Sequence, residues 1–239
     1  MEFAGIYGTH QRMQIPIEIG VVLHDPLTDS VSFAGKAFAG DIDVELWKNI
    51  TNDVGKRVEG SRRVFNLSRP GGTLAFDRKF HLDAEGARRA KAAIAKVHAD
   101  LKRFMQDLDR KNIGTLVFFA RRREMEAFQQ ARVNTGGFTI RDLQSEIREG
   151  YSLKEDVSLD RVSLVIGFAF QEDTIASTHF TYRIPGKFRY IIRPHKAIGD
   201  AARMLLVCRE FRGYPDDFGD RIREHVRHYD SRKTPPKED

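Results

Sequence analysis

A histidine and an aspartate near the end of the chain are the pair whose types and spacing could do chemistry. His195 lies five residues before Asp200, and residues 197–202 are mostly small and begin a predicted helix. An imidazole gains and loses protons near neutral pH, and a carboxylate binds hard divalent cations through oxygen. The pair therefore fits an acid–base and metal site. It also fits a structural residue before a helix followed by an ordinary polar helix residue.

The stretch Ile-Glu-Ile-Gly at residues 17–20, the segments 115–128 and 158–167, and the pair His195 and Asp200 follow one another in the chain. In this order they resemble motifs of the DEDDh 3′–5′ exonucleases, a family of the RNase H-like superfamily. The Ile-Glu-Ile-Gly stretch at residues 17–20 is similar to the strand that follows the first catalytic motif. Residues 115–128 occupy the place of the second motif, and residues 158–167 are similar to the helix ahead of the last motif. His195 and Asp200 match the last motif itself.

The resemblance implies a fold and a mechanism. The implied fold is α/β, with an RNase H-like mixed sheet in which an antiparallel three-strand meander is joined by parallel strands and flanked by helices. The strand after the long helix would pair in parallel with the first strand. Family members hold two divalent ions, Mg²⁺ or Mn²⁺, roughly 4 Å apart with four acidic residues, and the ions activate water. By this resemblance His195 would be the general base and Asp200 a metal ligand.

The other family positions do not supply the expected carboxylates. The first motif should be Asp-x-Glu on the first strand, where this chain has Gly5 and Tyr7, and neither side chain is a good magnesium ligand. The nearest candidate for the second motif is Glu124, which directly follows Arg121, Arg122 and Arg123. One matching carboxylate and one doubtful one cannot hold two magnesium ions. The sequence therefore predicts that the metal site is lost and that no cofactor is needed, with Mg²⁺ or Mn²⁺ expected only if the protein is active.

Basic residues suggest where a polyanion could bind. The net charge of +6 favours nucleic acid as a partner, although solubility or an acidic protein partner would also account for it. Three arginines at the end of a predicted sheet strand suit phosphate groups, because guanidinium groups donate in a forked geometry. A second basic group lies in the irregular segment 54–80, where phenylalanines alternate with Arg62, Arg63 and Arg69. Arginine and aromatic residues also anchor protein interfaces, so RNA and protein partners both remain open, as does a homodimer formed through the aromatic segment 180–193.

Composition limits the other possibilities. The chain has 239 residues, of which 41% are hydrophobic and 31% charged, which suits one globular domain. Its single cysteine, Cys208, lies in an apolar helical run and is expected to be a structural thiol rather than a nucleophile. The histidines are scattered without metal-binding spacing, so no zinc site is predicted. With no membrane span and no secretory signal visible, the sequence predicts an intracellular protein, cytoplasmic or nuclear.

The pattern along the chain predicts the elements that would position these residues. Strands are expected at residues 1–8, 15–24, 30–38, 115–120 and 138–143, and helices at 83–108, 124–133, 144–149, 158–166, 196–211 and 216–228. A short helix is expected after residue 41, and a hydrophobic insertion with strand-like ends at 168–192. We expect a single domain over residues 1–228, with insertions near 54–80 and 168–192, and a flexible polar tail at 229–239.

Three functions remain for this pattern. The leading expectation is a catalytically inactive exonuclease-like domain that binds RNA, or protein, in a nucleoprotein complex. The second is an active metal-dependent 3′–5′ exonuclease with rearranged carboxylates. The third is a scaffold that contacts only proteins.

Overall fold

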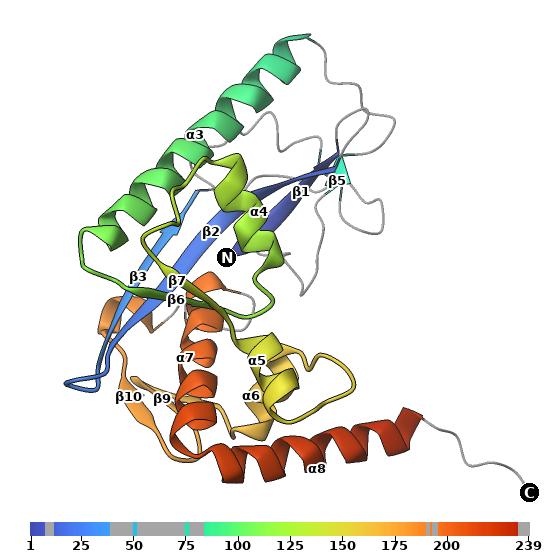
Figure 1. The fold of residues 1–239 in the computed structure, drawn as a ribbon. Coiled ribbons are helices and arrows are strands. Elements are labelled where there is room, and N and C mark those ends of the chain that lie inside the picture. The colour runs from blue at the N-terminus through green and yellow to red at the C-terminus, as the bar shows by residue number, and fades with distance from the viewer. Residues whose placement is uncertain are drawn as a thin grey trace, which may run out of the picture.

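The structure, a computed structural model, describes residues 1–7, 12–38, 50–51, 75–76, 84–189, 192 and 196–233. It is a mixed α/β arrangement of helices and small sheets, both antiparallel and parallel (Figure 1). No helix in these ranges has the length and apolar character needed to cross a membrane. The short helix expected after residue 41 and most of the segment 54–80 lie outside the described residues. The exceptions are strands β4 (Ile50–Thr51) and β5 (Ala75–Phe76), which pair with each other.

The N-terminal part is the expected antiparallel meander. It consists of β1 (Glu2–Tyr7), β2 (Arg12–Asp25) and β3 (Ser30–Ala37), with β2 in the middle. Successive side chains of a strand point to opposite faces, so β2 serves two cores. Ile19 is buried in one core, and Val22 packs against the other. Coverage of both faces explains the unbroken apolar run at residues 21–23, whereas residues 12–15 and 17–19 of the same strand alternate between polar and apolar.

The first core lies under a long helix. Helix α3 (Ala84–Asp109) buries Val97, Leu101, Met105 and Leu108, which recur at helical spacing. A β–α–β unit follows: β6 (Thr115–Phe118), α4 (Arg122–Gln130) and β7 (Thr139–Asp142). Strands β6 and β7 pair in parallel, as a helical crossover between them allows.

The second core is built from the C-terminal half of the chain. Its helices are α5 (Leu143–Gly150), α6 (Leu159–Val165), α7 (Ala197–Gly213) and α8 (Pro215–Lys233). A small antiparallel sheet of β8 (Ala169–Gln171), β9 (Thr174–Ala176) and β10 (Thr181–Arg183), followed by a 3-10 turn at Gly186–Phe188, supplies further buried side chains. Helix α8 crosses the ends of α6 and α7 (Figure 1).

One glycine brings α7 against the meander. A Cβ atom on Gly20 would lie 2.2 Å from the backbone nitrogen of Ile198, at the start of α7. A real side chain cannot occupy that space, so the close contact between β2 and α7 requires glycine at this position. The glycine of the Ile-Glu-Ile-Gly stretch thus sets how near the first turn of α7, which carries Asp200, comes to the sheet.

Two expectations about the architecture need correction. Within the described residues, β6 pairs with β7 and not with β1, whose neighbours are β2 and β5, so the parallel strands do not extend the meander into one mixed sheet. Helix α8 continues to Lys233, which places the first residues of the expected tail in a helix; residues 234–239 lie outside the described part. Hydrophobic residues of α8, including Val226, continue the packing face beyond Phe218 and Ile222, and this favours a longer helix.

Candidate functional site

Asp200 lies in the first turn of α7, beside two other charged residues. Arg203, one turn later, donates from one guanidinium nitrogen to Asp200 and from another to Asp160 in the first turn of α6. The Arg203 side chain is only 6% exposed, so this cation is held between the two carboxylates away from bulk water. The guanidinium therefore joins α6 and α7 and neutralises part of the charge of Asp200.

Glu18, from the middle of β2, completes this group. Its Oε2 lies 3.9 Å from Nζ of Lys196, the residue before α7. Burial raises the pKa of Glu18. The charge of Lys196 and the backbone N–H of Ala197 act in the opposite direction and lower this pKa, whereas the nearby Asp200 carboxylate raises it further. Glu18, Asp160, Lys196, Asp200 and Arg203 are called the Asp200 cluster below. Three carboxylates and two fixed cations share it.

Glu124 is also brought toward this cluster. It lies in the first turn of α4, and its Oε1 is 3.4 Å from the amino group of Met1. The same amino group is close enough to Glu18 to lower its pKa. Glu18 is thus influenced both by the matching carboxylate Asp200 and by the amino group that pairs with the doubtful carboxylate Glu124. Sequence reasoning had used Glu18 only as part of a strand motif.

The three arginines before Glu124, which we call the arginine triplet, are exposed at the start of α4. Arg122 pairs with Glu126 on the next turn at 3.0 Å, in an exposed position. The backbone here is fixed by Asp142, whose carboxylate accepts the N–H groups of Ala120 and Arg121, each at 3.2 Å. The triplet therefore projects from a held backbone, with Arg121 and Arg123 exposed and Arg122 in an exposed ion pair.

Several predicted site residues cannot be placed. His195, Arg62, Arg63 and Arg69 lie outside the described residues, so the structure does not test their roles. Gly5 and Tyr7 lie in β1, with their backbones paired to Gln14 and Arg12 of β2.

Cys208 is partly buried on α7, and burial raises the pKa of its thiol. A raised thiol pKa accords with the expected structural thiol, because the thiolate is the nucleophilic form.

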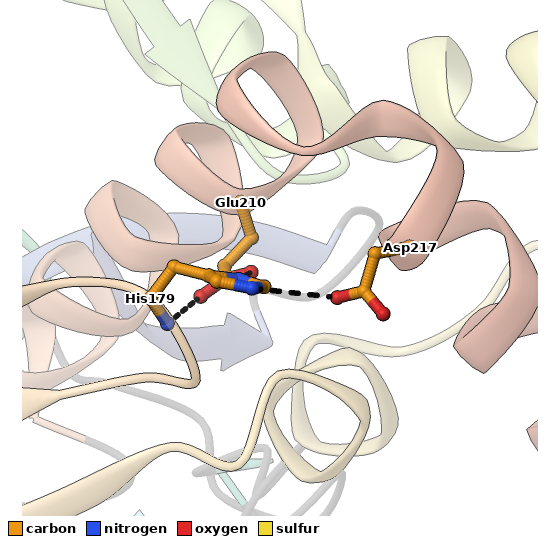
Figure 2. Close-up of side chains that lie close together, drawn as sticks. All are labelled: His179, Glu210 and Asp217. Atoms are coloured by element: carbon orange, nitrogen blue, oxygen red, sulfur yellow. Dashed lines mark hydrogen bonds and ion pairs between the residues drawn. The ribbon is translucent and has the colours of Figure 1, made fainter.

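A second charged group had no sequence signal. His179, Glu210 and Asp217 come from the β9–β10 loop, from α7 and from α8, and their side chains converge (Figure 2). His179 Nδ1 lies 2.9 Å from Glu210, and Nε2 lies 3.8 Å from Asp217. Arg221 of α8 bridges both carboxylates, and these four residues are called the His179 cluster. The reversal of the chain between α7 and α8 brings Glu210 and Asp217 together, and the β9–β10 loop adds His179.

The two clusters differ in their geometry for a metal ion. Among the described residues, only His179, Glu210 and Asp217 place three possible ligand atoms within 4.8 Å of one another. The carboxylates of the Asp200 cluster do not meet this condition.

Comparison with known proteins found no similar protein: no family model, curated protein or solved structure matches this chain.

Proposed function

We propose that this chain is a non-catalytic exonuclease-like domain of the RNase H-like class that binds single-stranded RNA. The observation that carries the proposal is the pairing within the Asp200 cluster. Asp200 and Glu18, the carboxylates at the contact of α7 with β2, each have a basic side chain of the same chain beside them. Two-metal hydrolysis needs carboxylates that are open to two ions roughly 4 Å apart. Carboxylates held by Arg203 and Lys196 are poorly suited to that task.

The order of elements supports the class. An antiparallel meander, a long helix, a strand–helix–strand unit and a C-terminal helix packed on the meander follow one another in the order that the sequence resemblance implies. The pairing of β6 with β7 departs from that scheme. The class therefore rests on element order and on the Asp200 position, together with the sequence motifs.

Charge supports RNA as the partner. The net charge is +6, and the arginine triplet is exposed at the start of α4, directly before Glu124. Forked guanidinium donors on a held backbone suit phosphate oxygens. Single-stranded RNA offers phosphates without the geometric demands of a duplex groove, so a short exposed arginine run can bind it.

The binding test compares two triple variants. Arg121, Arg122 and Arg123 are changed to alanine in one, and the exposed Lys102 and Arg103 of α3 together with Arg110, directly after α3, in the other, which removes the same charge. Affinity for a labelled single-stranded RNA is measured over a range of salt concentrations. The first variant should bind more weakly and lose about 0.7 from the slope of log K against log salt for each lost phosphate contact.

Two results would count against this proposal. Equal losses in the two variants would mean that only net charge matters and that the triplet is no site. Wild-type protein without salt-dependent RNA binding would favour the protein-only scaffold.

Catalysis is tested separately. The wild-type chain, incubated with the same RNA and with Mg²⁺ or Mn²⁺, should leave the 3′ end intact. Shortening from the 3′ end that disappears in Asp200→Ala would instead establish an active exonuclease with rearranged carboxylates. RNA binding and RNA cleavage are scored in different assays, so either half of the proposal can fail alone.

A further inference from the structure

The His179 cluster has the donor set of a transition-metal site. An imidazole nitrogen and two carboxylate oxygens lie within 4.8 Å of one another, and Figure 2 shows the three side chains converging from three segments. Zn²⁺ in proteins takes imidazole nitrogen and carboxylate oxygen ligands, with water able to complete the coordination. By composition and spacing alone, this group could hold a zinc ion.

A guanidinium already occupies the oxygens that such an ion would need. Nη2 of Arg221 lies 2.9 Å from Oε2 of Glu210 and 2.7 Å from Oδ2 of Asp217. Nη1 of the same group donates to the Val165 carbonyl at 2.9 Å and to Thr178 Oγ1 at 2.7 Å. Four contacts from two nitrogens fix the direction of the group, so the cation is held and not merely nearby.

Both carboxylate oxygens of Glu210 already have partners in this arrangement. Its side chain is completely buried, and besides Arg221 it accepts hydrogen bonds from Ser177 Oγ at 2.7 Å and from the His179 backbone N–H at 2.8 Å. A divalent ion bound beside Arg221 would place two cations on the same buried carboxylate, where repulsion is only weakly screened. Metal and guanidinium are therefore alternatives at this position.

We infer that Arg221 is the resident cation of a latent zinc-type site formed by His179, Glu210 and Asp217. In this arrangement the chain fastens α8 to α7 and to the β9–β10 loop with its own guanidinium in the place of a metal ion. The inference rests only on these contacts and stands whether or not the chain binds RNA.

The test asks whether removal of Arg221 opens the site. Zn²⁺ is titrated by calorimetry into the full chain as wild type, His179→Ala, Arg221→Met, Arg221→Met with His179→Ala, and Arg223→Met. Arg223 lies two residues further along α8 and pairs with Asp220, so it controls for loss of an arginine from this helix. Arg221→Met should bind one Zn²⁺ at least about tenfold more tightly than wild type, and His179→Ala should remove that gain. Arg223→Met should behave as wild type.

Two outcomes would overturn the inference. One is wild-type zinc binding that His179→Ala abolishes, since a metal would then be the natural occupant. The other is no gain in Arg221→Met. Should that variant be unfolded without metal, Zn²⁺ must restore its far-ultraviolet circular dichroism, because binding to a site absent from the unfolded chain drives folding. Arg221→Gln is measured in the same way. If either variant is unfolded without metal and Zn²⁺ does not restore its circular dichroism, the inference is also overturned.

Discussion

At the scale of single residues, Glu210 shows how a buried charge is stabilised. Burial by itself raises the pKa of Glu210, but donors from His179, Ser177 and Arg221 outweigh burial and hold the pKa below its ordinary range. Such a carboxylate is stable in the interior only while its donors remain. The residue therefore links the pH of the solution to the packing of α7 and α8.

Glu210→Gln should reduce the free energy of unfolding by about 3 kcal/mol at neutral pH, because it removes the buried one of the two carboxylates that neutralise Arg221. The folded pKa lies below the unfolded one, so the contribution of Glu210 is fully present above the unfolded value and is lost as the pH falls through the folded value. The difference between wild type and variant should be constant at neutral pH and shrink below about pH 4. Urea unfolding at a series of pH values measures it.

The control for this prediction is Glu126→Gln, since Glu126 forms only an exposed pair with Arg122. That change should alter the free energy of unfolding by less than about 1 kcal/mol. A Glu210→Gln effect that does not vary with pH would contradict the proposed role of its charge.

At the scale of elements, the contact of β2 with α7 determines where the Asp200 cluster forms. Gly20 allows the contact, Lys196 precedes the helix, and Asp200 occupies its first turn. The cluster depends on this one crossing, because Glu18 comes from the strand and the other charges come from α6, from α7 and from the residue that precedes α7. A larger residue at position 20 should therefore displace the charged side chains of the Asp200 cluster, although it does not contact them.

Gly20→Ala should lower the free energy of unfolding by about 3 kcal/mol or more, because its methyl group would meet α7 backbone rather than a side chain that could move aside. Thermal unfolding of this variant is compared with that of Gly114→Ala. A Cβ on Gly114 would have nothing within 4 Å, and that variant should stay within about 0.5 kcal/mol of wild type. Equal effects of the two changes would show that the crossing is looser than these distances indicate.

Much of the element pattern could be predicted from sequence. The helical spacing of Val97, Leu101, Met105 and Leu108 predicted α3, and the run of β-branched residues predicted β2, because periodicity is a local property. Strand pairing is not local: nothing in residues 115–118 indicates that β7 and not β1 is their partner. The same reason hid the His179 cluster, in which His179, Glu210 and Asp217 lie 31 and 7 residues apart and meet only in the folded chain. Asp200 could be selected in advance, but Arg203 and Asp160 could not be recognised as its partners.

At the scale of the whole molecule, two cores share the meander. One lies under α3 and the other among α5 to α8 and the small sheet, and β2 contributes to both. Helix α8 contributes Phe218 and Ile222, whose side chains are completely buried. The last described helix is therefore part of the second core and not an appendage.

A chain that ends at Tyr214 should lose cooperative thermal unfolding. Removal of a buried phenylalanine or isoleucine side chain costs about 2–5 kcal/mol each, and natural domains are stable by about 5–15 kcal/mol in total. A chain that ends at Lys233 keeps every described contact of α8 and should melt like the full chain. Circular dichroism melting distinguishes the two, and an unaltered transition in the shorter chain would contradict the role given to α8.

The arginines that bridge carboxylates in both clusters make the charge of each cluster independent of the ions in the surrounding solution. Arg203 and Arg221 are attached to the backbone that also carries Asp200 and Asp217, one turn away in each case. Their local concentration is fixed by the covalent chain and does not vary with the supply of ions or the presence of chelators. A free ion would leave on dilution, whereas these cations are synthesised with the protein in a fixed ratio of one to each cluster. The amino-acid sequence thus sets the charge balance of both clusters. A mutation can change this balance, but a low concentration of metal ions cannot.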